Sequence, residues 1–98
     1  MVENELIQII NKQINTDLTE DISNNELHQK LTAFINNLIV NDFQKLISIL
    51  YRVDVDEKKL KRILIENTGM DAGEIIAALI IERELQKIET RKQFGVKK

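Results

Sequence analysis

The sequence of 98 residues contains no cysteine, no proline and only three glycines. Without cysteine the chain has no disulfide, no thiolate metal site and no cysteine nucleophile, and we expect a reducing compartment, the cytoplasm. Proline and glycine are the residues that most often interrupt helices and form tight turns. Their scarcity therefore favours long helices joined by short connections.

Long apolar runs are also missing. A membrane-spanning helix needs about 20 mainly apolar residues, whereas the run at 75–81 covers seven positions. The N-terminus carries Glu3 and Glu5, where a secretory leader would be basic. With 43% hydrophobic and 31% charged residues, the composition is that of a globular domain. We expect a single helical domain over 1–94 and a short basic tail over 95–98, neither exported nor inserted in a membrane.

Charge is low overall but unevenly divided. The formal net charge is -2, yet residues 1–42 sum to -5 and residues 43–98 to +3. This asymmetry has two interpretations: the halves attract each other, within one chain or between antiparallel copies, or the charges simply lie on solvated helix faces.

Apolar residues recur every three or four positions, which is the period of an amphipathic helix. Helix start signals are Ser23 with Glu26, Asp42, Asp54 with Glu57, and Asp71 with Glu74. We predict a first helix that ends near 15 or 16, and further helices over about 24–40, 43–53, 57–67 and 72–92. Gly69 is predicted to be a left-handed C-cap and Gly73 to allow a close helix approach. The predicted fold class is all-α: a compact bundle of about five helices with a long C-terminal helix.

The apolar run at 75–81 is the most informative feature, because seven apolar residues cover every side of a helix for nearly two turns. The run is either buried at the centre of one domain or covered on one side by a second copy of the chain. A seam at a spacing of three and four continues along this helix and is a candidate partner interface. Its residues are Ala78, Ile81, Leu85 and Ile88.

Several residues that could carry chemistry have simpler explanations. His28 is the single histidine, so two-histidine metal motifs are excluded. Asp54, Asp56 and Glu57 lack the glycine and the terminal glutamate of a calcium loop. Gly69 and Gly73 lack the Gly-Lys-Ser/Thr of a phosphate loop. We therefore predict no catalytic residue, no metal site and no cofactor.

A basic cluster on the fourth predicted helix is the strongest sign of nucleic-acid binding. Together with the preceding helix it could pass for a helix-turn-helix. Nearby carboxylates nearly cancel its charge, however, and the turn holds no glycine. The candidate contacts are Lys58, Lys59, Lys61 and Arg62.

Three segments carry a resemblance to a known group of proteins. Residues 42–47, 50–61 and 80–83 read DFQKLI, LYRVDVDEKKLK and IIER. These segments resemble those of small uncharacterised helical proteins of Bacteroidetes-type bacteria, over roughly the C-terminal two-thirds of the chain. The resemblance implies a bacterial origin and a cytoplasmic location, and it carries no catalytic signature.

The leading interpretation is a non-enzymatic protein-protein interaction module, a homodimer through the last helix. The alternative is a small nucleic-acid-binding protein that uses the basic face at 57–67. A third hypothesis, an enzyme that uses acids, Tyr51 or Arg52 in a helix-lined pocket, has no support beyond the presence of those residues.

Overall fold

Five α-helices form the protein, whose computed structural model describes residues 4–14, 16, 18–19 and 22–95. No strand occurs among these residues. The all-α class, the five helices and the long C-terminal helix are confirmed. The last helix runs three residues past its predicted end, so residue 95 is helical, and 96–98 of the predicted tail lie outside the described residues. The helices are α1 (Asn4–Ile14), α2 (Asn24–Asn41), α3 (Phe43–Val53), α4 (Glu57–Glu66) and α5 (Ala72–Gly95).

Most of the predicted helix caps are present. The Ser23 hydroxyl accepts the Glu26 N–H at 3.1 Å, and the Ser23 N–H donates to the Glu26 carboxylate at 3.2 Å, which completes a capping box. Asp42 accepts the Lys45 N–H at 3.2 Å and so begins α3. Asp71 accepts the Glu74 N–H at 3.2 Å at the start of α5. These side chains satisfy N–H groups that a helix terminus leaves unpaired.

Two cap predictions are wrong. Asp56, not Asp54, caps α4, because its carboxylate accepts the N–H groups of Lys58 at 3.0 Å and Lys59 at 3.4 Å. Asp54 instead ends α3 in the left-handed conformation, with φ 69° and ψ 49°. Gly69 does not adopt positive φ. Glycine is the usual left-handed residue, but aspartate tolerates the conformation when nearby groups stabilise it.

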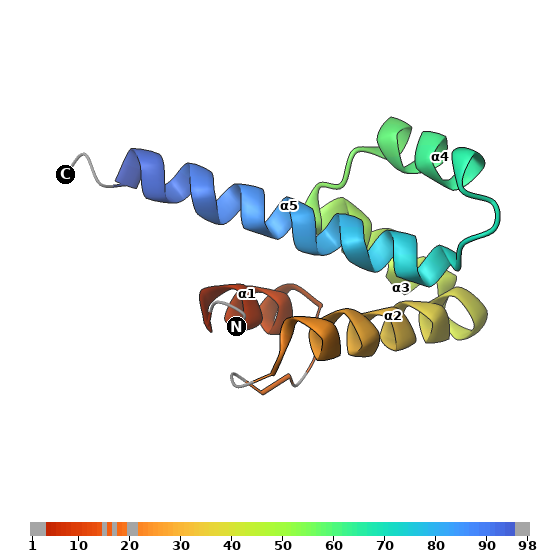
Figure 1. Cartoon of the computed structure of the whole chain (residues 1–98), viewed down its shortest axis with the longest axis horizontal. Coiled ribbons are helices and arrows are strands. Elements are labelled where there is room, and N and C mark those ends of the chain that lie inside the picture. Colours follow the sequence, from red (N-terminus) through yellow and green to blue (C-terminus); the bar gives the residue numbers. More distant parts are fainter. Residues whose placement is uncertain (1–3, 15, 17, 20–21, 96–98) are drawn as a thin grey trace.

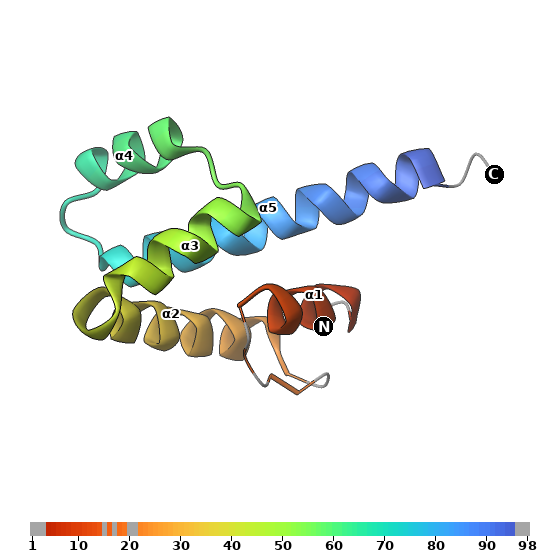
Figure 2. The same cartoon turned by 180° about the vertical axis from the view of Figure 1, so that it is seen from behind.

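The long helix α5 organises the bundle, since it contacts each of the other four helices. Helix α2 lies along it, and α1 and α3 pack against it from further sides (Figure 1). Helix α4 contacts α5 alone among the helices and stands apart from α1 and α2 in both views (Figure 2). The cluster of buried apolar residues draws on α1, α2, α3 and α5, whereas none of the residues of α4 is buried.

Polar contacts fasten α1 at both ends. Arg52 of α3 donates to the Gln13 carbonyl at 2.9 Å, near the C-terminal end of α1, where carbonyl groups lack helical partners. Arg91 of α5 forms an ion pair with Glu5 in the first turn. Of the four ion pairs in the described part, this pair alone joins the acidic half, residues 1–42, to the basic half, residues 43–98.

Gly73 lies buried where α5 crosses α2. A Cβ atom at this position would overlap Oδ1, Cγ and Nδ2 of Asn36, which are its three nearest atoms. The Asn36 amide is held in place because it donates to the Asp71 carboxylate at 2.8 Å. The predicted close approach at Gly73 is confirmed, and it depends on one side-chain amide.

Glu84 is the one charged side chain fully buried in the described part of the chain. Lys87 Nζ lies 2.9 Å from its Oε1 as an ion pair between residues three positions apart, but neither carboxylate oxygen accepts a well-oriented hydrogen bond. Removing one partner of such a pair leaves a buried, uncompensated charge.

We expect Gly73→Ala to destabilise the fold by about 1 to 3 kcal/mol through overpacking. Gly69→Ala is the matched control, because no atom lies within 4 Å of its added methyl group and its φ is not positive. The penalty should largely vanish in an Asn36→Ala background, since that change removes all three overlapping atoms. Thermal unfolding of the four variants measures this coupling; an equal penalty in both backgrounds would contradict it.

We expect Lys87→Met to destabilise the protein by roughly 3 kcal/mol, because Glu84 then has no countercharge. The double variant Glu84→Leu with Lys87→Met should regain most of that loss. Lys59→Met is the control, because its partner Glu82 is half exposed and such pairs contribute at most about 1 kcal/mol. Urea unfolding gives the values, and similar losses for the two lysines would argue against the buried pair.

Candidate functional site

The four residues of the predicted interface on the last helix do not share one surface. Ile81 and Ile88 are buried in the chain's own core, whereas Ala78 and Leu85 are exposed. The exposed pair borders a shallow depression of about 490 Å³ beside His28 of α2. Only half of the predicted seam is therefore accessible to a partner.

The apolar run at 75–81 is covered almost completely within one chain. Six of its seven residues are buried, and Ala78 is the exception. Of the two interpretations of this run, the structure supports burial at the centre of one domain. A second copy is not needed to cover it.

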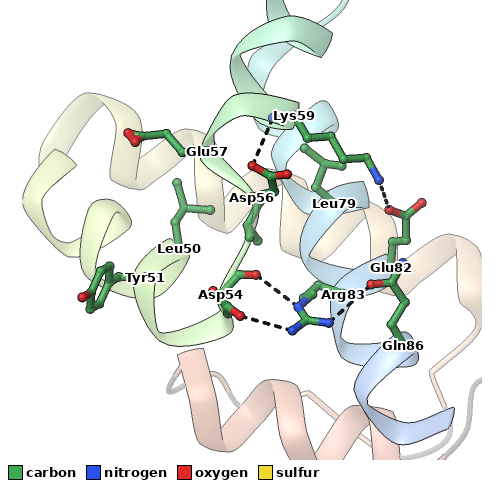
Figure 3. A pocket seen from close by; sticks show the side chains of 11 residues that line it. Leu50, Tyr51, Asp54, Asp56, Glu57, Lys59, Leu79, Glu82, Arg83 and Gln86 are labelled. Atoms are coloured by element: carbon green, nitrogen blue, oxygen red, sulfur yellow. Dashed lines mark hydrogen bonds and ion pairs between the residues drawn. The ribbon is translucent and has the colours of Figure 1, made fainter. Parts of the chain in front are cut away.

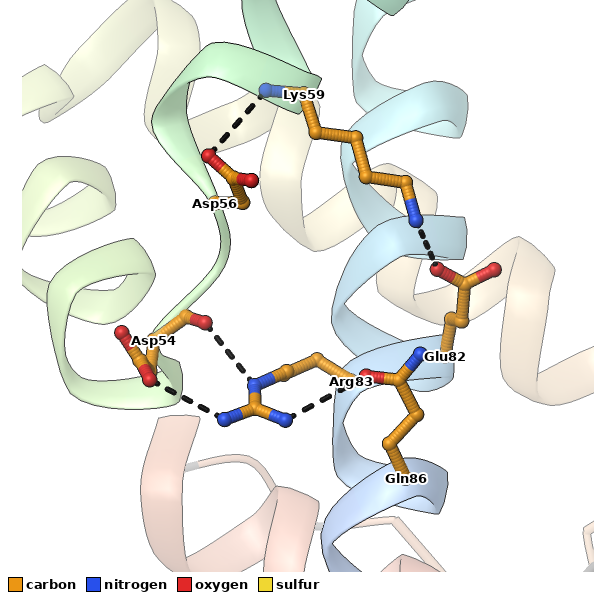
Figure 4. A network of polar contacts seen from close by, with 6 residues as sticks. All are labelled: Asp54, Asp56, Lys59, Glu82, Arg83 and Gln86. Carbon is orange, nitrogen blue, oxygen red and sulfur yellow. Dashed lines mark hydrogen bonds and ion pairs between the residues drawn. The ribbon is translucent and has the colours of Figure 1, made fainter.

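The predicted basic cluster is divided. Lys58, Lys61 and Arg62 are exposed on α4. Lys59 turns toward α5, and its Nζ lies 2.8 Å from Oε1 of Glu82 (Figure 4). One of the four cations thus fastens α4 to the bundle, and three remain on its outer side.

Three large exposed apolar side chains form a line on α3. Phe43, Ile47 and Tyr51 are spaced by four positions, so they lie along one side of the helix, and they are 55%, 45% and 89% exposed. We call them the α3 ridge. The apolar residues of this helix are therefore divided between the core and the surface. The buried side of α3 consists of Leu46, Ile49 and Val53.

A pocket of about 660 Å³ adjoins the Tyr51 end of the ridge. It lies between the end of α3, the start of α4 and the middle of α5 (Figure 3). Leu50, Val55 and Leu79 give it an apolar portion, and charged side chains surround them. We call it the Tyr51 pocket. Its lining residues are Leu50, Tyr51, Asp54, Val55, Asp56, Glu57, Lys59, Leu79, Glu82, Arg83 and Gln86.

Arg83 of α5 holds the turn that shapes this pocket. Its Nε donates to the Asp54 backbone carbonyl at 3.1 Å, and a terminal nitrogen donates to the Asp54 carboxylate at 3.2 Å (Figure 4). The other terminal nitrogen donates to Gln86 at 3.4 Å. A planar guanidinium suits this fork-like contact. The left-handed residue Asp54 is thereby joined to the central helix.

The reactive side chains considered from sequence are not assembled into a catalytic arrangement in the described part. Tyr51 borders the pocket, but Arg52 lies on another side of α3 and binds the Gln13 carbonyl. Asp54 pairs with Arg83, and Asp56 caps α4. Glu82 pairs with Lys59. Of the four acids that line the pocket, three are therefore held in structural contacts, and Glu57 is the fourth.

The described residues include no group of three or more His, Cys, Asp or Glu side chains placed to hold a metal ion. Among the helices of this same portion, none has the length and apolarity that crossing a membrane requires.

No protein-family model matches the chain, and no curated protein or solved structure matches it. The function is therefore inferred from the geometry of the chain's own residues.

Replacing Asp54 tests whether the left-handed turn is strained. Asp54→Ala and Asp54→Gly both remove the carboxylate that Arg83 contacts, but only glycine relieves the positive φ. We expect the alanine variant to be about 1 kcal/mol less stable than the glycine variant. Chemical unfolding compares the pair; equal stabilities would mean that the turn relaxes without Arg83.

Proposed function

We propose that the protein is a non-enzymatic helical module that binds another protein through the α3 ridge and the Tyr51 pocket. The observation that carries this proposal is the exposure of three large apolar side chains in a row beside a concave site. Single exposed apolar residues are ordinary on protein surfaces, whereas contiguous apolar patches mark interaction sites. Aromatic residues such as Phe43 and Tyr51 are enriched at protein interfaces. We place the protein in the cytoplasm, in keeping with its lack of cysteine.

A homodimer is one form that this function can take. The seam predicted on the last helix offers only Ala78 and Leu85, which is a small area for a stable interface. The α3 ridge presents larger side chains, so we favour it as the contact surface over the last helix.

Nucleic-acid binding remains the alternative function, supported by the exposed Lys58, Lys61 and Arg62. It is the weaker candidate because Lys59 pairs with Glu82 within the bundle. In addition, Asp56 and Glu57 lie at the start of α4, where a recognition helix would contact base edges.

Site-specific photocrosslinking in the cell of origin tests the proposed function. We expect a benzophenone amino acid at Tyr51 to give a discrete covalent adduct, because this side chain is 89% exposed at the proposed contact. Asn37, exposed on α2, is the control position, and Leu85 tests the last helix. An adduct of twice the chain mass indicates a second copy, and a nuclease-sensitive adduct indicates nucleic acid. No adduct at Tyr51 above the Asn37 background contradicts the proposal.

A further inference from the structure

The shape of the exposed surface indicates what kind of segment it accepts. The α3 ridge extends over nine residues, 43–51, or about 12 Å along the helix axis. An amphipathic helix places side chains at i, i+4 and i+7 over a similar length, and recognition of this type uses an apolar groove. Strand addition needs an open sheet edge, and the described part of the chain contains no strand. The surface thus suits a helix about two turns long at its contact.

The charges around the Tyr51 pocket favour a basic residue in that helix. Four acids and two bases line the pocket, and both bases are held in ion pairs, Lys59 with Glu82 and Arg83 with Asp54. The side chain of Glu57 is exposed at the rim and has no hydrogen bond or ion pair with the described residues. The exposed ring of Tyr51 adds a surface over which a cation can sit.

Further along α4, the exposed charges favour an acidic residue of the partner instead of a basic one. Lys58 follows Glu57 directly but is rotated by about 100° around the helix from it. Lys61 and Arg62 follow Glu57 by about one turn, and all three cations are exposed. A basic residue of the partner placed beside them would be repelled, and an acidic one attracted. The charge pattern therefore also orients the partner, with its basic end over the Tyr51 pocket.

A second copy of the chain fits this surface less well. Two α3 ridges packed antiparallel about Ile47 would place Phe43 of one copy opposite Tyr51 of the other, so that the neighbouring Asp42, an acid and not a base, would lie beside the Tyr51 pocket. Helices α2 and α3 direct apolar side chains into the core, and α4 rests its half-buried apolar side against α5. The occupant that the charges favour is a different protein.

We propose that the α3 ridge and the Tyr51 pocket bind an amphipathic helix of another protein, which places a lysine or arginine between Glu57 and Tyr51. This inference rests on the proposed function and specifies the chemistry of its partner.

A displayed library of random peptides of about 16 residues, or about four helical turns, tests the proposal. The folded chain is the bait, and Ile47→Glu serves for counter-selection. We expect enriched peptides to carry apolar residues at helical spacing and a lysine or arginine next to one end of that stripe. Enriched peptides that are acidic, or that lack a basic residue at that position, would overturn the proposal.

Affinity measurements on the strongest selected peptide provide the matched comparison. Glu57→Lys should weaken binding about tenfold, because it reverses the charge that faces the basic residue. Glu66→Lys makes the same change at the far end of α4 and should alter binding less than about twofold. Glu57→Gln removes the negative charge with less perturbation of α4, and it should still weaken binding several-fold. Equal effects of the substitutions at 57 and 66 would reject the assigned contact.

The two proposals can fail separately. Peptides that bind the chain but not its Ile47→Glu variant, and that carry no basic residue, would reject the proposed partner chemistry and leave the interaction surface in place. The absence of any Ile47-sensitive peptide would reject the helical ligand, while crosslinking at Tyr51 decides independently whether the surface meets a protein.

Discussion

The fold depends on burying one segment of α5 on almost every side. Residues 75–81 are apolar around the whole helix, and each Å² of apolar surface left in water costs about 25 cal/mol. Helices α1, α2 and α3 all contact α5, and six of the seven residues of this segment are buried. A close crossing with α2 at Gly73 and a buried ion pair at Glu84 are both consequences of this central position.

The same constraint creates the candidate site. Helix α3 packs against α1, α2 and α5, whereas α4 contacts α5 alone among the helices, so α4 does not cover the α3 ridge. The chain turns from α3 to α4 through the left-handed Asp54, and α5 contacts both sides of that turn. Arg83 of α5 binds Asp54, and Glu82 of α5 pairs with Lys59 in the first turn of α4. An apolar surface and a pocket with an acidic surplus thus arise from how the central helix distributes its neighbours.

The polar interactions mostly define ends and turns. Ser23, Asp42, Asp56 and Asp71 begin helices, and Arg52 binds a carbonyl at the end of α1. Of the four ion pairs in the described residues, three lie within the basic half of the chain. Within the described residues, one ion pair, Arg91 with Glu5, joins residues 1–42 to residues 43–98.

The sequence alone determined the helices, because apolar periodicity and capping side chains act over a few residues. It predicted α3 at its observed bounds and the starts of α2 and α5, and it identified Gly73 as a contact point. Only the tertiary structure decided which side of each helix faces the core. Periodicity gives Phe43, Ile47 and Tyr51 the same apolar character as Leu46, yet only Leu46 is buried, because α1, α2 and α5 pack against α3 on its other sides and α4 does not contact it. Likewise, the pairing of Arg83 with Asp54 joins residues far apart in the chain, and no local pattern encodes that distance.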